Sequence, residues 1–162
     1  MPANPYEWQV LTAVQDALEG IDGTGDYAHD LDSRVALGAF EPSRPPFETR
    51  PCAAVILAEV SETDGPDLPG HEVALTVLVQ GWATAATDSA GGRTLAGIQL
   101  LSDVRTALIA ARLDSSTALY SLYAFDISAS AVDGRQAGLS FEGGYLAAQI
   151  TATYHRAQGQ GE

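Results

Sequence analysis

Residues 71–82, HEVALTVLVQGW, alternate between apolar and polar positions almost without interruption. A period of two is typical of a β-strand that has one face fully buried. The aliphatic face consists of Val73, Leu75, Val77 and Val79. The opposite face also carries Leu78 and Trp82, so we expect a helix or another subunit to cover part of it.

The segment 93–113, RTLAGIQLLSDVRTALIAARL, changes to a helical period and predicts the longest helix of the chain. Its expected buried stripe consists of Leu101, Val104, Leu108 and Ala111, widened by Ile98 and Leu100. Its expected outward residues are Gln99, Ser102, Asp103 and Thr106. Residues 83–92, ATAATDSAGG, predict a loose, glycine-rich loop between the strand and this helix.

A first helix of about 15 residues is predicted near the N-terminus. Asn4 can cap it, Pro5 suits its first position, and Gly20 and Gly23 end it. Its expected apolar stripe consists of Trp8, Leu11, Val14, Leu18 and Ile21.

The remaining segments predict further strands separated by polar or proline-rich connections. The strands are expected at 34–40 (short), 52–60, 125–132 and 145–155, with an irregular crossing segment at 41–51 and a long hairpin loop at 61–70. Strands in hairpin order favour an α+β fold, in which two helices pack on a mainly antiparallel or mixed sheet of about four to five strands. We expect one domain over residues 1–156 and a disordered polar tail at 157–162.

The chain is strongly acidic, with a net charge of −13 and arginine as its only strongly basic residue type. This charge disfavours binding to free nucleic acid, which depends on cations displacing counterions. It is consistent with a solubilising surface, or with a surface that lies near DNA without binding it. We expect no export signal and no membrane span, because the longest apolar runs are too short.

The sequence offers little catalytic chemistry. Asp26, His29, Asp30 and Asp32 lie close together, but their spacing does not match an EF-hand, and a turn-rich solvated loop explains them better. The single cysteine, Cys52, begins an apolar run and is expected to pack in the core. Phosphate-binding, zinc and nucleophile motifs are missing from the sequence, so we expect no enzyme activity, cofactor or metal site.

Several local patterns, taken in order, resemble the tail terminator (tail-completion) proteins of long-tailed bacteriophages. They are NPYEWQVLTAVQDALEGI, DLDSRVALGAF, PCAAVILAEV, EVALTVLVQGWA, LAGIQLLSDVRTALIAARL and EGGYLAAQITATYHR, which together span about residues 4–156. None of these patterns is a catalytic fingerprint, and other phage neck or minor tail proteins share much of the layout.

The resemblance implies a structural virion protein that forms a ring, typically a hexamer. Such a ring caps the tail tube, ends tail polymerisation and joins the DNA-filled head through a neck or connector protein, while DNA passes through the lumen. The strand 72–82 could supply an edge or a face to the ring, and the loops 61–70 and 84–93 could contact partners. Expected contact residues are Asp64, Asp67, Leu78, Gln80, Trp82, Thr87, Asp88 and Arg93.

Three other classes remain open at this point, one of which is a bacterial housekeeping domain of unknown role. Another head–tail connector would assemble in a similar way. A small-molecule enzyme or ligand-binding domain would instead require a deep pocket with convergent polar groups and perturbed titratable residues.

Overall fold

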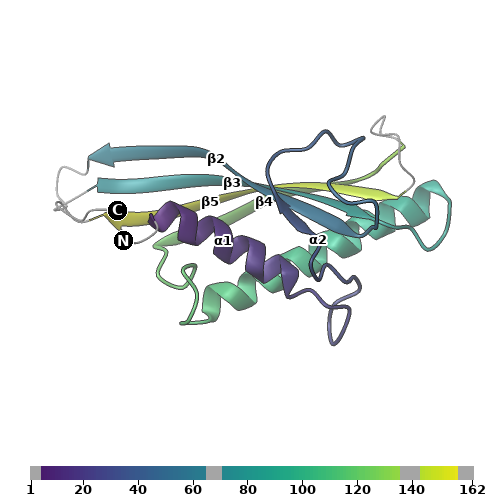
Figure 1. Cartoon of the computed structure of the whole chain (residues 1–162), viewed down its shortest axis with the longest axis horizontal. Coiled ribbons are helices and arrows are strands. Elements are labelled where there is room, and N and C mark those ends of the chain that lie inside the picture. The colour runs from purple at the N-terminus through teal and green to yellow at the C-terminus, as the bar shows by residue number, and fades with distance from the viewer. Residues whose placement is uncertain (1–4, 65–70, 136–142, 157–162) are drawn as a thin grey trace.

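The computed structural model describes residues 5–64, 71–135 and 143–156. The described elements follow in the order α1 (Tyr6–Glu19), β1 (Val35–Leu37), β2 (Cys52–Asp64), β3 (His71–Ala83), α2 (Ala90–Leu113), β4 (Ala124–Asp133) and β5 (Gly144–Arg156). Figure 1 shows both helices on one side of a long sheet. The predicted α+β fold is confirmed.

The sheet has five strands in the order β1-β2-β3-β5-β4. β1 pairs with β2 in parallel, and all other neighbours are antiparallel, so the sheet is mixed. β3 lies between β2 and β5 along its whole length and therefore has no free edge. The expectation that this strand could supply an edge to a ring is wrong. The strand expected at 52–60 continues to Asp64, so the predicted loop at 61–70 begins later.

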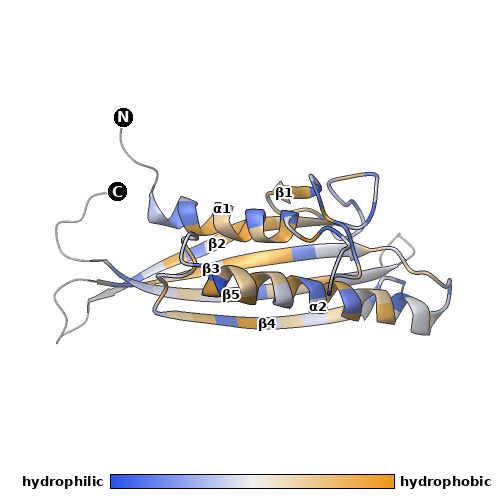
Figure 2. Ribbon diagram, turned by 90° about the horizontal axis from the view of Figure 1, so that it is seen from below, coloured by the Kyte–Doolittle hydropathy of each residue, from blue (hydrophilic) through white to orange (hydrophobic). Residues whose placement is uncertain are grey.

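The alternation in β3 and β5 places one aliphatic face under the helices, as predicted. On β3, Val73, Leu75, Val77 and Val79 are buried, and Val77 pairs with Ile150 of β5. These side chains meet the apolar stripes of α1 and α2, which lie side by side over the sheet (Figure 2). This two-layer packing forms the main core of the protein.

The first helix begins at Tyr6, and Pro5 directly precedes it. Asn4, the predicted cap, lies outside the described residues. Leu11, Val14 and Leu18 are buried as expected, but Trp8 is 44% exposed. Tyr6 is the aromatic residue of this helix that packs against the core. Its ring packs on Tyr154 with 4.5 Å between centroids, and its hydroxyl donates to the Ala118 carbonyl.

The second helix begins at Ala90, inside the loop predicted at 83–92, and two of its side chains lie in environments opposite to those expected. Ile98, expected in the buried stripe, is 51% exposed. Asp103, expected to face solvent, is buried. The sheet-facing stripe instead runs through Ala96, Leu100, Val104, Ala107 and Leu108, with Ser89 capping the helix by accepting from the Gly92 N–H. The buried face of α2 therefore includes one carboxylate, that of Asp103.

Candidate interaction surfaces

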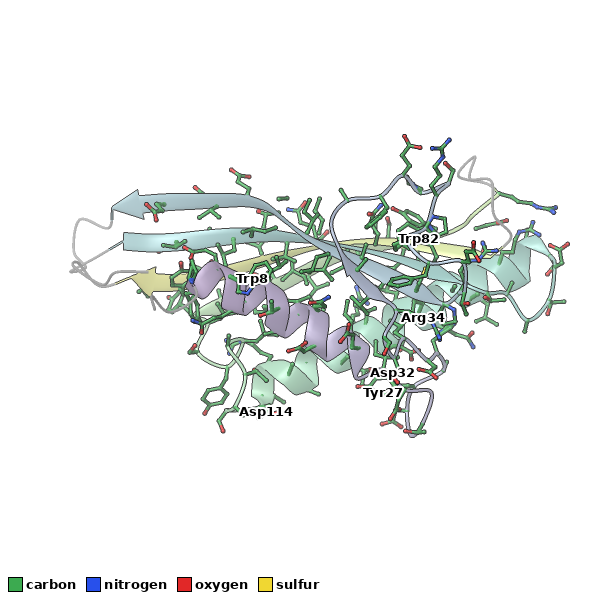
Figure 3. All side chains as sticks on the ribbon, viewed as in Figure 1. Trp8, Tyr27, Asp32, Arg34, Trp82 and Asp114 are labelled. Atoms are coloured by element: carbon green, nitrogen blue, oxygen red, sulfur yellow. The ribbon has the colours of Figure 1, made fainter. Side chains whose placement is uncertain are left out.

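Trp82 lies inside the protomer, on the sheet face opposite the helices. Its side chain is fully buried with Cys52 and Ala54 beneath residues 39–50, and its ring meets Tyr145 edge to face at 5.6 Å. The indole Nε1 donates to the Pro42 carbonyl at 2.8 Å. Figure 3 shows Trp82 between the sheet and this covering segment. The expected cover, a helix or another subunit, is therefore wrong at Trp82, where the chain's own irregular segment 39–50 covers the strand, and Leu78 stays exposed.

Gln80 fastens the same segment. Its Oε1 accepts from the Phe40 N–H at 2.9 Å, and its Nε2 donates to the Phe40 carbonyl at 2.7 Å. Nε2 also donates to the Tyr145 hydroxyl at 3.0 Å. This paired contact imitates a strand pair and satisfies backbone groups that the irregular, proline-rich segment cannot pair in a sheet.

The thiol of Cys52 provides a direct test of this cover. Burial raises the pKa of Cys52, while the hydrogen bond from the Phe47 backbone and the charges of Arg50 and Arg34 act in the opposite direction. A raised pKa lowers the thiolate population, and the thiolate is the reactive form. We expect a disulfide reagent such as DTNB to label the native protein at pH 8 only slowly, at the rate of unfolding. Fast stoichiometric labelling without denaturant would show that residues 39–50 open readily.

Arg93 joins three parts of the chain at the start of α2. Its Nε donates to Asp133 at the end of β4, and its NH1 donates to Asp88 in the preceding loop, both at 2.7 Å. The hydrogen bond with Asp133, followed by its charge and that of Asp88, raises the pKa of Arg93 against the effect of burial. Arg93 therefore stays charged and pins the loop and β4 to the helix.

The eight contact residues expected from the sequence do not form one site. Gln80 and Trp82 hold the segment 39–50, Asp88 and Arg93 form the ion-pair network, and Leu78 and Thr87 are exposed in different places. Asp64 is the last residue of β2, and Asp67 lies outside the described residues.

Asp103 anchors the acidic loop that follows α1. It accepts from the backbone N–H groups of Ala28 and His29, and its Oδ2 lies 3.0 Å from the His29 Nδ1. His29 thus has a structural partner on α2. Within the described residues, no group of three or more His, Cys, Asp or Glu side chains is arranged to hold a metal ion. The carboxylate of Asp103 therefore organises this loop through the backbone of Ala28 and His29.

A groove of about 490 Å³ separates α1 from the C-terminal half of α2. Its lining is dominated by small residues and includes Ala13, Ala17, Ala107, Ala110 and Ala111. Asp114, at its end (Figure 3), has its pKa lowered by the Ser116 backbone N–H and then by the Ser116 hydroxyl. Tyr27 also lines the groove, and burial together with Asp103 raises its pKa. Both shifts move these groups away from titration near neutral pH, where a general acid or base would work.

The sheet face opposite the helices is uncovered beyond residues 39–50. The register places uncharged side chains there, including Thr76, Leu78, Ser128, Gln149 and Thr151. The acidic residues on this face of the described strands are Glu59, Glu72 and Asp126, and none of its described strand positions carries arginine.

Two edges of the described sheet have no strand partner. β4 has a partner on one side only, and β2 beyond Val55 has none on its outer side. Because β2, β3, β5 and β4 alternate in direction, β2 and β4 run in opposite directions. A head-to-tail neighbour could therefore pair β4 with β2 in the antiparallel sense that prevails in the rest of the sheet.

Comparison with protein-family models and with curated proteins finds no match for this chain. None of the helices in the described part of the chain combines the length and the apolar character that crossing a bilayer requires.

Proposed function

We propose that this chain is a structural virion protein of a tailed phage or a phage-like particle. Copies of it would form a ring, typically of six, that caps the tail tube, ends tail polymerisation and joins the head through a neck or connector protein. It would be made in the host cytoplasm and reside at the head-proximal end of the tail. The observation that carries this proposal is the pair of free, oppositely running edges of β2 and β4.

These edges supply what a ring needs. A ring forms when one surface meets a different surface of the next copy and the rotation closes. Open edges also invite strand pairing with another chain, and a closed ring removes that liability. A ring that joins β4 to β2 would make one continuous sheet with all helices on one side.

The uncovered sheet face would then line the opening of the ring. Its charged strand residues Glu59, Glu72 and Asp126 are acidic, and arginine is absent from its described strand positions. Tight binding to DNA requires cations that replace condensed counterions. A face of this composition would let DNA pass without holding it.

The test combines light scattering with electron microscopy of tail tubes assembled in vitro from a phage tail tube protein. We expect rings at the tube ends and shorter, more uniform tubes when the protein is present. A matched pair of variants probes the edge: Ser128→Glu on β4 and Gln149→Glu, its partner on β5. The first places a carboxylate beside the part of β2 beyond Val55 in the next copy, which is itself acidic. The like charges repel, so ring formation should fall at least about tenfold. The second adds the same charge one strand inside and should leave the ring intact.

Monomer alone, with no density at tube ends, would overturn the proposal. Rings that bind isolated head portals but not tubes would assign the protein to the neck instead. The groove between the helices is the feature that a ligand-binding domain would use. Saturable binding of a small molecule there, together with no assembly, would favour that class.

A further inference from the structure

The outward face of α2 carries a second apolar stripe, opposite the one that packs on the sheet. Its apolar members are Leu95, Ile98, Ile109 and Leu113, which are 53%, 51%, 55% and 74% exposed. A helix on a protein surface normally has one apolar and one polar face, and a helix that is apolar on both is usually covered on both. The outward side of α2 therefore calls for a covering partner.

The stripe follows one line along the helix. Leu95 and Leu113 are 18 residues apart, which corresponds to about five turns, or about 27 Å. Ser102 and Thr106 occupy the middle of the line, and both are exposed. From either end the order is leucine, isoleucine, hydroxyl, hydroxyl, isoleucine, leucine, at positions 95, 98, 102, 106, 109 and 113.

This order makes the stripe complementary to itself. When two copies of α2 run antiparallel, Leu95 of one copy lies opposite Leu113 of the other, and Ile98 lies opposite Ile109. The hydroxyl-bearing residues then meet each other at the centre. A contact in which one patch meets the same patch on a second copy is the signature of a two-fold axis.

The charge distribution favours a second copy at this face. The chain has a net charge of −13, so two copies repel one another over most approaches. From Thr94 to Leu113 the only carboxylate is Asp103, which is buried under the acidic loop. Arg112 donates to carbonyl groups at Leu119, Tyr120 and Leu122, which leaves Arg105 as the exposed cation of this helix. Two copies can thus meet through α2 without opposing carboxylates.

We infer that the outward stripe of α2 is a self-association surface, on which a second copy of this chain docks through antiparallel α2–α2 packing across a two-fold axis. One helix pair is a small contact, at the low end of specific interfaces. The dimer should therefore be weak, with a dissociation constant of about 10 µM or higher. Salt should strengthen it, because it screens the repulsion between the acidic copies and between the two Arg105 side chains beside the axis.

Sedimentation velocity over a concentration series, up to about 1 mM, tests the surface. We expect the wild type to shift from monomer to dimer with concentration and more readily at higher salt. Ile98→Glu should weaken dimerisation at least about tenfold, because each dimer would place two carboxylates against apolar side chains. Gln149→Glu is the matched control, since it adds the same charge at an exposed position on the sheet face opposite the helices, away from α2. Circular dichroism should show an unchanged fold for both variants, because both positions are exposed.

Cross-linking tests the antiparallel arrangement. Differently tagged Ile98→Cys and Ile109→Cys proteins are mixed and oxidised, while the native Cys52 is buried and does not compete. We expect the mixed 98–109 disulfide to form several-fold more than the 98–98 disulfide. In the antiparallel pair the two residues at position 98 are separated by about 17 Å along the axis.

Monomer over the whole concentration series would overturn the inference, and so would equal dimerisation of Ile98→Glu and the wild type. Predominant 98–98 cross-links would exclude the antiparallel pairing. The dimer does not depend on the ring, because it uses α2 rather than the sheet edges. Ile98→Glu protein that still caps tail tubes would leave the proposed function standing while removing the dimer, and a dimer without capping would do the reverse.

Discussion

Replacing Trp82 with alanine is expected to lower the free energy of unfolding by about 3–5 kcal/mol, the range for removing a large buried aromatic side chain. The indole is fully buried, packs on Tyr145 and donates to the Pro42 carbonyl. The substitution would leave a cavity under residues 39–50 and an unpaired carbonyl. Urea denaturation followed by circular dichroism measures the loss.

The control is Trp8→Ala, which removes the other tryptophan of the chain. Trp8 is 44% exposed on α1, so its loss should cost much less than that of Trp82. Each variant also keeps one tryptophan as a fluorescence probe. Emission from Trp82 alone should be blue-shifted in the native state and should shift to the red on unfolding.

A different result would change the role of Trp82. If Trp82→Ala kept its stability and lost self-association, the indole would have to lie at a subunit boundary. The hydrogen bond to Pro42 and the packing within the protomer argue for the stability effect. If Trp82→Ala lowers stability as expected, self-association should change only to the extent that residues 39–50 loosen.

The sequence predicts the strands well because alternation depends on local residues. Each aliphatic residue on the buried face of β3 lies two positions from the next, and its burial follows from the pleat alone. The same pattern predicts that Trp82 is buried, but it does not indicate which segment covers it. The answer depends on Gln80, whose amide holds Phe40, a residue 40 positions earlier.

The second helix shows the same limit. Its length and its sheet-facing stripe are predictable, yet Asp103 and Ile98 exchange their expected environments. Asp103 is buried because the backbone N–H groups of Ala28 and His29, more than 70 positions away, satisfy its oxygens. The pattern could not place Ile98, because α2 carries apolar residues on both sides and its periodicity therefore does not indicate which face is buried. Hydropathy alone could not have assigned either position.

The close approach of α2 to the sheet gives the second large effect. Gly144 of β5 lies against the backbone of α2, and a Cβ added there would fall 2.2 Å from the Gly97 nitrogen and 2.7 Å from the Arg93 carbonyl oxygen. Both atoms belong to the backbone of a helix, so they cannot turn away as a side chain would. Accommodation would require the start of α2 to move off the sheet, and with it Arg93 from Asp133.

Gly144→Ala should therefore destabilise the protein by about 3 kcal/mol or more, at the upper end of the overpacking range. The matched control is Gly91→Ala, in the first turn of the same helix, where an added Cβ meets nothing within 4 Å. That substitution should be neutral or stabilising by up to about 1 kcal/mol, because alanine favours helix and restricts the unfolded chain. Thermal unfolding of the two variants measures the contrast. Equal melting temperatures would mean that α2 can shift freely on the sheet. The packing that places its outward stripe would then be adjustable rather than fixed by the close contact of Gly144 with Gly97.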